Sequence, residues 1–437
     1  MSERADLAAD TIFALGSGAG RAAIAIIRIS GPGAEEALRA LAGKLPEPRR
    51  ATFAILRDPA TGETLDRGIA LFFPGPASST GEDYAELQLH GGRAVVEGTL
   101  AALQRLPGLR PAEPGEFARR GFANGKLDLS QAEALADLID AQTQAQRRQA
   151  LRIAGGALRH KVEGWRGALI EALALLEAEL DFSDEADVQA FSPARLDALL
   201  SSLAEDMRAA LRLAPASERM RDGFTVMILG RPNAGKSTLI NALTERDLAI
   251  VSPIPGTTRD MIEAHLEIGG LPVTLIDTAG LREAAEEIER IGVDRTLARI
   301  ESADLALWLS DSGEAPLRGD VETIRVATKI DLKRAPVGAI GICALSGEGL
   351  ETLAAAIEAR ARARLSDGSE ALIVRDRHRL ALEQAVEGIE AVTARQAPLE
   401  LQAEELRRAA RALGRIVGVA DVEEVLDVVF SRFCIGK

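Results

Sequence analysis

The chain has 437 residues, of which 47% are hydrophobic and 3% aromatic, enough for about three domains of ~150 residues each. Its 52 basic and 66 acidic residues leave a net charge of −14, which argues against a non-specific coat on a polyanion but not against a local basic patch. The two cysteines, Cys343 and Cys434, exclude a disulfide framework, and the absence of a long apolar run or a signal-peptide core leads us to expect a soluble cytoplasmic protein.

The first 122 residues alternate short apolar runs with Gly- and Pro-rich turns. The runs Ile24–Ile29 and Ile69–Phe73 are rich in β-branched or aromatic residues, and each predicts a buried strand. We therefore expect an N-terminal α+β domain over residues 1–122.

Residues 123–219 have a different pattern, in which leucines recur at the spacing of one helix face, as between Leu169 and Leu180. The polar segment Asp181–Glu185 predicts the end of that helix. Residues 374–437 return to a helical pattern. Because neither stretch has an obvious core of its own, we expect the two to pack together as one α-helical domain.

Residues 220–373 alternate apolar runs with turns and helical stretches, which is typical of a doubly wound parallel sheet. A nucleotide-binding domain inserted into the helical domain is therefore the predicted organisation. The runs that predict its strands are Phe224–Leu229, Val273–Ile276, Leu305–Leu309, Ile324–Ala327 and Ile340–Ile342.

The segment Gly230–Ser237 reads Gly-Arg-Pro-Asn-Ala-Gly-Lys-Ser, which is a complete phosphate-binding loop. It follows the predicted strand Thr225–Leu229 and opens a helix, which is the context that this motif requires. Its glycines let backbone N–H groups point at phosphate oxygens, at the positive end of the helix. We expect Lys236 to reach the β- and γ-phosphates and Ser237 to hold Mg²⁺.

Two later segments predict groups that sense the metal and the γ-phosphate. Thr258, within Gly256–Asp260, has a hydroxyl suited to Mg²⁺. Asp277 ends an apolar strand and is placed to hold the metal through water, and Gly280 offers an N–H to the γ-phosphate. Loss of that phosphate would release both segments, which predicts an order–disorder switch.

The segment Thr328–Asp331 predicts the choice of base. The Asp331 carboxylate can accept from the two N–H donors on the guanine edge, and adenine lacks that pair. Thr328 stands where GTPases usually carry Asn, and Cys343–Leu345 stands where Ser-Ala-Lys is common. A threonine can still form a hydrogen bond and the Ala344 backbone can still contact the base, so we expect guanine preference to persist. These motifs, in this order, predict a Ras-like P-loop G domain.

The group that orients the attacking water is less evident. Leu281 stands where many GTPases have a glutamine, and leucine cannot orient water. Asn233 is suited to a monovalent cation, together with carbonyl oxygens near Ser252 and Ile254, and K⁺ there would supply the positive charge of an arginine finger. Acidic candidates for the water are Glu283, Glu286, Glu287 and Glu289.

With these motifs in view, the chain resembles the tRNA modification GTPase family called MnmE or TrmE, nearly from end to end. The C-terminal Phe433–Lys437, Phe-Cys-Ile-Gly-Lys, is specific to this family when a G domain precedes it. The other segments that carry the resemblance are Ile27–Gly31, Gly81–Gln88, His90–Gly92, Pro114–Phe117, Asn124–Leu129, Gln131–Ala134 and Asp137–Ala141.

The resemblance implies an N-terminal domain similar to folate-binding aminomethyltransferases, through which a homodimer forms. It also implies a complex with an FAD-dependent partner, MnmG. The two proteins together would add an aminomethyl-type group, carboxymethylaminomethyl, to C5 of the wobble uridine of certain tRNAs. A tetrahydrofolate derivative would supply the carbon, FAD would enter through the partner, and K⁺ would promote dimerisation of the G domains and GTP hydrolysis.

The resemblance also implies roles for individual residues. Folate would be bound by Arg28, Glu86 and Lys126, with Lys437 nearby. Mg²⁺ would be held by Ser237 and Thr258, and K⁺ by Asn233, Ser252, Ile254 and Thr257. The GTP site would comprise Asn233, Ala234, Gly235, Lys236, Ser237, Thr238, Ser252, Thr257, Thr258, Asp277, Thr278, Ala279, Gly280, Thr328, Lys329, Asp331, Cys343, Ala344 and Leu345.

For two residues, the role that the resemblance implies differs from the role expected without the family. Glu289 matches the catalytic glutamate that acts through water, but without the family it would be read as a solvated charge on a helix. Cys434 would take part in the modification, whereas a lone cysteine is most often a small apolar filler.

The sequence does not identify the surface that contacts tRNA, because each of two candidate basic stretches can also be a solvated helix face. The function also has an alternative, a regulatory or ribosome-assembly GTPase without covalent chemistry, while a plain folate aminomethyltransferase would leave the G domain idle. One candidate set for tRNA is Arg147, Arg148, Arg152, His160 and Lys161, and the other is Arg407, Arg408, Arg411 and Arg415.

Overall fold

The computed structural model divides into two compact units, Met1–Ala136 with Gly414–Lys437, and Asp137–Leu413. Among the residues it describes, no helix combines the length and the hydropathy that crossing a membrane requires. These residues are 10–18, 20–182, 193–244, 263–277, 303–311, 321–365, 370–395, 397–420, 423–431, 433 and 435–436.

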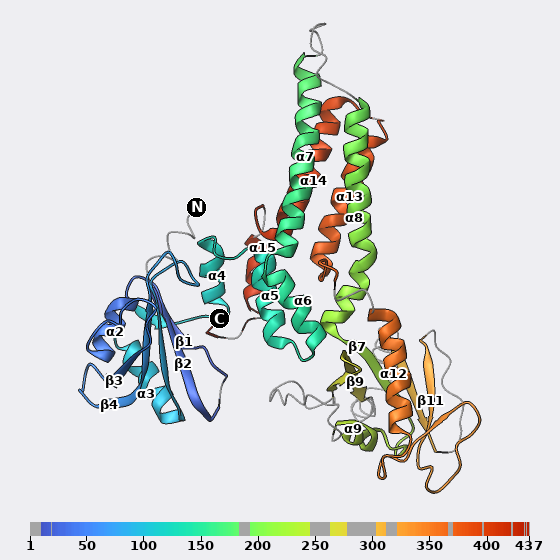
Figure 1. Cartoon of the computed structure of the whole chain (residues 1–437), viewed down its shortest axis with the longest axis horizontal. Coiled ribbons are helices and arrows are strands. Elements are labelled where there is room, and N and C mark those ends of the chain that lie inside the picture. Colours follow the sequence, from blue (N-terminus) through green and yellow to red (C-terminus); the bar gives the residue numbers. More distant parts are fainter. Residues whose placement is uncertain are drawn as a thin grey trace, which may run out of the picture. The chain divides into compact units, whose positions relative to one another are not determined.

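The first unit contains a six-stranded sheet in the order β3-β4-β5-β2-β1-β6, in which β1 and β6 are parallel and the other neighbours antiparallel. Helices α2 and α3 bury their apolar residues against it (Figure 1), which confirms the α+β prediction. The elements are β1 (Thr11–Leu15), β2 (Ala22–Ser30), α2 (Ala34–Ala42), β3 (Thr52–Arg57), β4 (Thr64–Phe73), β5 (Tyr84–Gly91), α3 (Arg93–Gln104), β6 (Leu109–Pro111), α4 (Glu116–Ala123), α5 (Leu129–Asp140), which extends into the second unit, and α15 (Glu423–Ser431).

The two strands predicted in this unit are present, but they are not buried throughout. Ile27 and Ile29 on β2 are fully buried, whereas Ile24 is 60% exposed, and Ile69 on β4 is 38% exposed. Successive side chains of a strand point to opposite faces of the sheet, and the helices cover one face. An apolar run therefore predicted the strands correctly and their burial only in part.

A buried ion network joins β1, the loop before β5, β6 and α4. Arg120 is 1% exposed, and its Nη2 donates to Asp10 Oδ1 at 2.6 Å and to Glu116 Oε1 at 3.0 Å. Its Nη1 lies 3.2 Å from Glu82 Oε2, and Arg110 Nη2 lies 2.6 Å from Glu116 Oε1. Burial raises the pKa values of Asp10 and Glu116, but hydrogen bonds from the two arginines outweigh it and hold both pKa values below their usual range.

The second unit contains long helices that pack along their lengths. α7, α8, α13 and α14 lie side by side (Figure 1), which confirms that the two helical stretches flanking the G domain pack together. Leu169 and Leu176 are fully buried on α7, as the leucine spacing predicted, and α7 ends at Phe182. The helices are α6 (Gln144–Ala154), α7 (Ala157–Phe182), α8 (Pro193–Asp222), α13 (Asp376–Thr393) and α14 (Leu399–Val417).

The G-domain sheet has the order β12-β11-β10-β7-β9-β8 and is parallel except for β8. All five predicted strands are present, and α9 and α12 contribute to the core of the domain. The antiparallel β8, absent from the prediction, joins β9 through Gly269 and Gly270, whose φ angles of 61° and 81° suit a tight hairpin. The elements are β7 (Phe224–Gly230), α9 (Lys236–Thr244), β8 (Glu263–Ile268), β9 (Leu271–Asp277), β10 (Leu305–Ser310), β11 (Thr323–Ala327), β12 (Ile340–Gly341) and α12 (Leu350–Leu365).

Candidate functional site

The phosphate loop lies between the end of β7 and the start of α9, as its sequence predicted. Three of its residues have positive φ angles: Gly230 at 154°, Asn233 at 62° and Gly235 at 92°. A Cβ atom on Gly230 would lie 2.6 Å from the carbonyl oxygen of Leu309, so no larger residue fits there. A loop of this conformation turns successive N–H groups inward, which suits a phosphate.

Lys236 lies over this loop rather than in solvent. It is 9% exposed, and its Nζ donates to the carbonyl oxygens of Gly230 at 3.2 Å and Arg231 at 3.1 Å. The ammonium group is therefore held at the N-terminus of α9, beside the N–H groups that would contact phosphate.

The structure brings Ser237 and Asp277 together although they are 40 positions apart in the chain. Ser237 Oγ donates to Asp277 Oδ2 at 3.1 Å, and Asp277 is 1% exposed at the end of β9. The parallel pairing of β7 with β9 sets this distance, because it places Ile228 opposite Asp277 just before the loop. A hydroxyl and a carboxylate at this spacing fit the oxygen ligands that Mg²⁺ prefers.

The predicted base-reading segment follows β11 and lies against the phosphate loop. Lys329 has a φ angle of 59°, and its Nζ donates to the carbonyl oxygen of Asn233 at 3.1 Å and to Asp311 Oδ2 at 3.0 Å. The Lys329 hydrogen bond lowers the pKa of Asp311. Asp331 is exposed at the same loop, so its carboxylate is accessible to a base.

The segment after β12 completes this side of the G domain. Ile330 N donates to the carbonyl oxygen of Ile342 at 3.3 Å, which joins the two loops. Cys343 is 4% exposed, and its N–H donates to Glu348 O at 2.9 Å, whereas Leu345 is 87% exposed. Thr328 Oγ1 is buried and has no hydrogen-bond partner within the described part of the chain. Cys343 therefore shapes the loop, and the threonine hydroxyl remains available for hydrogen bonding.

A second set of predicted residues gathers in the N-terminal unit. Arg28 and Glu86 are opposite each other on β2 and β5, with Arg28 Nε 3.6 Å from Glu86 Oε1. Arg28 Nη1 donates to the carbonyl oxygen of Gly436 at 3.0 Å, so the C-terminal segment lies beside this pair. Tyr84 Oη donates to Glu86 Oε1 at 3.1 Å, and burial raises the pKa of this phenol.

Lys126 lies near Gly81, where a Cβ atom would be 3.3 Å from Lys126 Cε. Among the hydrogen bonds and ion pairs of the described residues, none joins Lys126 to Arg28 or Glu86. The structure thus brings Arg28 and Glu86 together with the backbone of Gly436. Lys126 lies in the turn between α4 and α5, near Gly81.

Comparison with known proteins covers almost the whole chain. The family described as GTP-binding protein TrmE N-terminus matches residues 11–126, and the MnmE helical domain matches residues 129–434. The tRNA modification GTPase MnmE of Beijerinckia indica is 52% identical over 435 residues, covering 98% of this chain and 96% of that protein. The same protein of Methylobacterium sp. strain 4-46 is 54% identical over 452 residues, covering 98% and 100%.

The chain belongs to the MnmE family of tRNA modification GTPases. Solved structures that resemble it include the G domain of T. maritima FeoB, with a TM-score of 0.25 and 27% identity over 31% of this chain and 98% of that one. Another is A. aeolicus Era, with a TM-score of 0.24 and 26% identity over 30% and 55%. The family assignment rests on the full-length relatives, since these TM-scores are low.

Several residues that the MnmE resemblance singles out lie outside the described residues, so their geometry is not part of the site above. Of the other predicted GTP-site residues, Ala234 lies in the phosphate loop just before α9 and Thr238 lies in the first turn of α9. The residues outside the description are Ser252, Ile254, Thr257, Thr258, Thr278, Ala279, Gly280, Glu289, Cys434 and Lys437.

The contacts that attach the MnmE-family G domain to its helices could not be predicted from the sequence, in which Arg152 was only a candidate for tRNA binding. Gln146 Nε2 donates to the carbonyl oxygen of Arg221 at 2.9 Å, where the chain enters the G domain, and Arg152 Nη1 donates to that of Glu370 at 2.6 Å, where it returns. Gln149, 4% exposed, donates to Ser217 Oγ at 2.8 Å. The capping box formed by Thr143 and Gln146 predicts the start of this helix, but no local pattern predicts its distant partners.

Proposed function

We propose that this protein is a GTPase that, with an FAD-dependent partner, adds an aminomethyl-type group to C5 of the wobble uridine of certain tRNAs. The observation that carries the proposal is the end-to-end likeness to tRNA modification GTPases. Two features support it from the residues: the phosphate loop with Ser237 and Asp277 3.1 Å apart, and the Arg28–Glu86 pair beside the C-terminal segment.

At the nucleotide site, Lys236 and the loop N–H groups bind the phosphates, and Asp331 accepts from the guanine edge. Ser237 and Thr258 would hold Mg²⁺, and the ion would supply positive charge to the phosphoryl oxygens. Thr328 Oγ1, buried and without a partner among the described residues, is free to bond the base or the loop beside it. Glu289 positions the attacking water in place of the missing glutamine at Leu281.

At the N-terminal site, Arg28, Glu86, Lys126 and Lys437 bind a tetrahydrofolate derivative. The residues fit such a ligand, because guanidinium and ammonium groups match its glutamyl carboxylates and a carboxylate matches its pterin edge. Arg28 Nε is buried and makes no hydrogen bond within the described residues, so a donor is available there. Cys434 belongs to the same segment as Gly436 and takes part in the modification.

Nucleoside mass spectrometry of tRNA from a strain lacking this gene tests the proposal. We expect the carboxymethylaminomethyl modification of wobble uridine to disappear and to return when the gene is restored. A profile that stays unchanged, with ribosomal precursors accumulating instead, would favour the alternative of a ribosome-assembly switch.

GTP hydrolysis is expected to be several-fold to many-fold faster in KCl than in NaCl at equal ionic strength. Asn233, with Ser252, Ile254 and Thr257, would hold K⁺ where its charge stabilises the transition state. The Asn233 backbone already has the positive φ angle of the loop, so Asn233→Gly preserves that conformation and removes the amide. The variant should lose the preference for K⁺, and equal wild-type rates in both salts would refute the cation site.

A further inference from the structure

One segment of this acidic chain contains no carboxylate. Residues 141–162 include neither Asp nor Glu, although the whole chain has 66 acidic and 52 basic residues. The segment covers α6 and the start of α7, which are in contact. Its basic residues are Arg147, Arg148, Arg152, Arg159, His160 and Lys161. A local positive field on a chain of net charge −14 acts over about a Debye length, ~8 Å at physiological salt, so it acts only on a partner close to this segment.

The structure separates these cations by their partners. Arg159 Nε lies 2.8 Å from Glu163 and Lys161 Nζ lies 2.7 Å from Asp206, so both have counter-ions on the bundle. Arg147 and Arg148 are exposed, and no carboxylate of the described residues pairs with either. Two adjacent arginines thus retain their full donor sets toward solvent.

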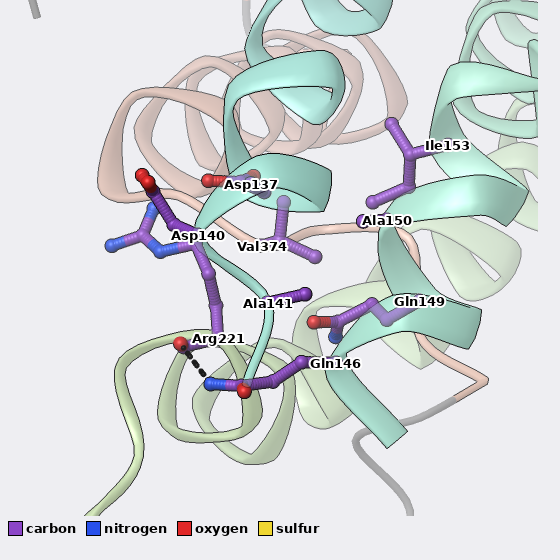
Figure 2. Close-up of a pocket in the computed structure, with 9 residues that line it drawn as sticks. All are labelled: Asp137, Asp140, Ala141, Gln146, Gln149, Ala150, Ile153, Arg221 and Val374. Atoms are coloured by element: carbon purple, nitrogen blue, oxygen red, sulfur yellow. Dashed lines mark hydrogen bonds between the residues drawn. The ribbon is translucent and has the colours of Figure 1, made fainter. Parts of the chain in front are cut away.

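The two faces of α6 have different environments. Gln146, Gln149 and Ile153 line a small pocket between α6, the end of α5 and the end of α8, and Figure 2 shows these side chains directed into it. At 3.6 residues per turn, Arg147 and Arg148 fall on the opposite side of the helix. We call this side, with Leu151 at 49% exposure and Arg152, the outer face of α6.

In the second candidate basic stretch, on α14, each arginine has a partner. Arg408 lies 2.5 Å from Glu405 and Arg411 lies 2.6 Å from Glu404, and both pairs lie within the helix. Arg407 lies 2.6 Å from Glu177 of α7, and Arg415 also has a partner. Cations neutralised by neighbouring carboxylates release few counter-ions on meeting a polyanion, so this stretch fits a solvated helix face.

We propose that the outer face of α6, with Arg147 and Arg148 at its centre, binds the phosphodiester backbone of the tRNA substrate. The inference rests on the proposed function for the identity of the RNA. Guanidinium groups offer paired donors that match phosphate oxygens, and a face without carboxylates adds no repulsion. The opposite face of the same helix holds the end of α8, where the chain enters the G domain, through Gln146 and Gln149.

The test measures binding of an unmodified tRNA transcript to the full-length protein over a series of KCl concentrations. The double variant Arg147→Gln, Arg148→Gln should bind about tenfold more weakly near physiological salt. The slope of log Kobs against log [KCl] should fall by about 1.4–1.8, because about 0.7–0.9 counter-ions are released per phosphate contact. Intrinsic GTP hydrolysis without tRNA should stay at the wild-type rate, since neither residue belongs to the nucleotide site.

The matched control is Arg408→Gln, Arg411→Gln, which removes the same charge from the paired stretch of α14 and should leave affinity and slope within about twofold. Wild-type affinity and slope in the α6 variant would overturn the inference while leaving the proposed function intact. Loss of binding to the FAD-dependent partner with unchanged tRNA binding would also overturn it and assign the face to a protein. Unchanged wobble nucleosides in the deletion strain would instead overturn the proposed function.

Discussion

Replacement of Arg120 by methionine is expected to destabilise the N-terminal unit by about 3–5 kcal/mol. Arg120 is 1% exposed and contacts three carboxylates, those of Asp10, Glu82 and Glu116. Methionine has similar bulk but no donor, so Glu82 would keep only its bond from Ser30, at 2.8 Å, among the described contacts. Removing one partner from a buried network leaves uncompensated charge, which costs more than the net contribution of the intact pair.

Hydrogen exchange followed by mass spectrometry measures this effect within the full chain. Peptides from β1, β5 and α4 should exchange at least about 100-fold faster in the variant, and peptides from β7 and β10 should not change. Arg39→Met is the control, because Arg39 is exposed and forms a pair with Glu35 within one helix turn, which should contribute less than about 1 kcal/mol. Equal protection in wild type and Arg120→Met would contradict the structural role of the network.

The network also predicts the response to acid. The pKa values of Asp10 and Glu116 are lowered in the folded protein, so their contribution is complete above the unfolded-state pKa values of about 4. It is lost as the pH falls through the lower, folded-state values. Protection of the N-terminal unit, corrected for intrinsic exchange, should therefore decrease below about pH 4 in wild type and depend less on pH in Arg120→Met.

Asp331→Asn is expected to weaken GTP binding by about 10²–10⁴-fold, because two charge-assisted hydrogen bonds to the guanine edge are lost. The asparagine amide would meet the guanine amino group donor to donor. Xanthine carries an oxygen at that position and can accept from the amide, so xanthosine triphosphate should bind the variant better than GTP. The exposed position of Asp331, on the loop that Lys329 joins to Asn233, gives the base access to either side chain.

Titration calorimetry with GTP, ATP and xanthosine triphosphate compares the three affinities directly. Glu348→Gln is the matched control, since it removes one carboxylate from the exposed loop after β12 and leaves the backbone bond from Cys343 in place. This control should retain wild-type affinity for GTP. If Asp331→Asn bound GTP as tightly as wild type does, base recognition would lie elsewhere, and the interpretation of Thr328–Asp331 would be wrong.

The nucleotide site could be predicted from sequence because its parts follow strands of a regular topology. Parallel strands end at one edge of a sheet, so Ser237 and Asp277 had to come together once β7 and β9 were neighbours. The strand β8 was missed although Ala264, Leu266 and Ile268 alternate with polar residues and two glycines follow. This alternation predicts a half-exposed strand, which a criterion of continuous apolar runs does not detect.

The buried polar contacts could not be predicted in the same way. Arg120 takes its partners from positions 10, 82 and 116, and Gln149 reaches Ser217. No local pattern distinguishes these side chains from the many arginines and glutamines on solvated helices. Their pairing depends on tertiary packing, which places a few polar groups together at low dielectric. For the same reason, the sequence alone does not distinguish the two candidate basic stretches, because it does not show which of their arginines have carboxylate partners.

The helical bundle can accommodate the inserted G domain because the two segments that connect it lie close together. Ser217 Oγ donates to the carbonyl oxygen of Ala371 at 3.5 Å, so the polypeptide leaves α8 and returns toward α13 at nearly one point. To the helical bundle, the entire G domain is equivalent to the closed loop of a hairpin. Loop-closure entropy grows only with the logarithm of length, and a folded insert whose ends already meet adds little to it. The inserted G domain therefore adds little to the loop-closure entropy of the helical bundle. A short glycine linker in place of the G domain should leave α8 and α13 as antiparallel neighbours.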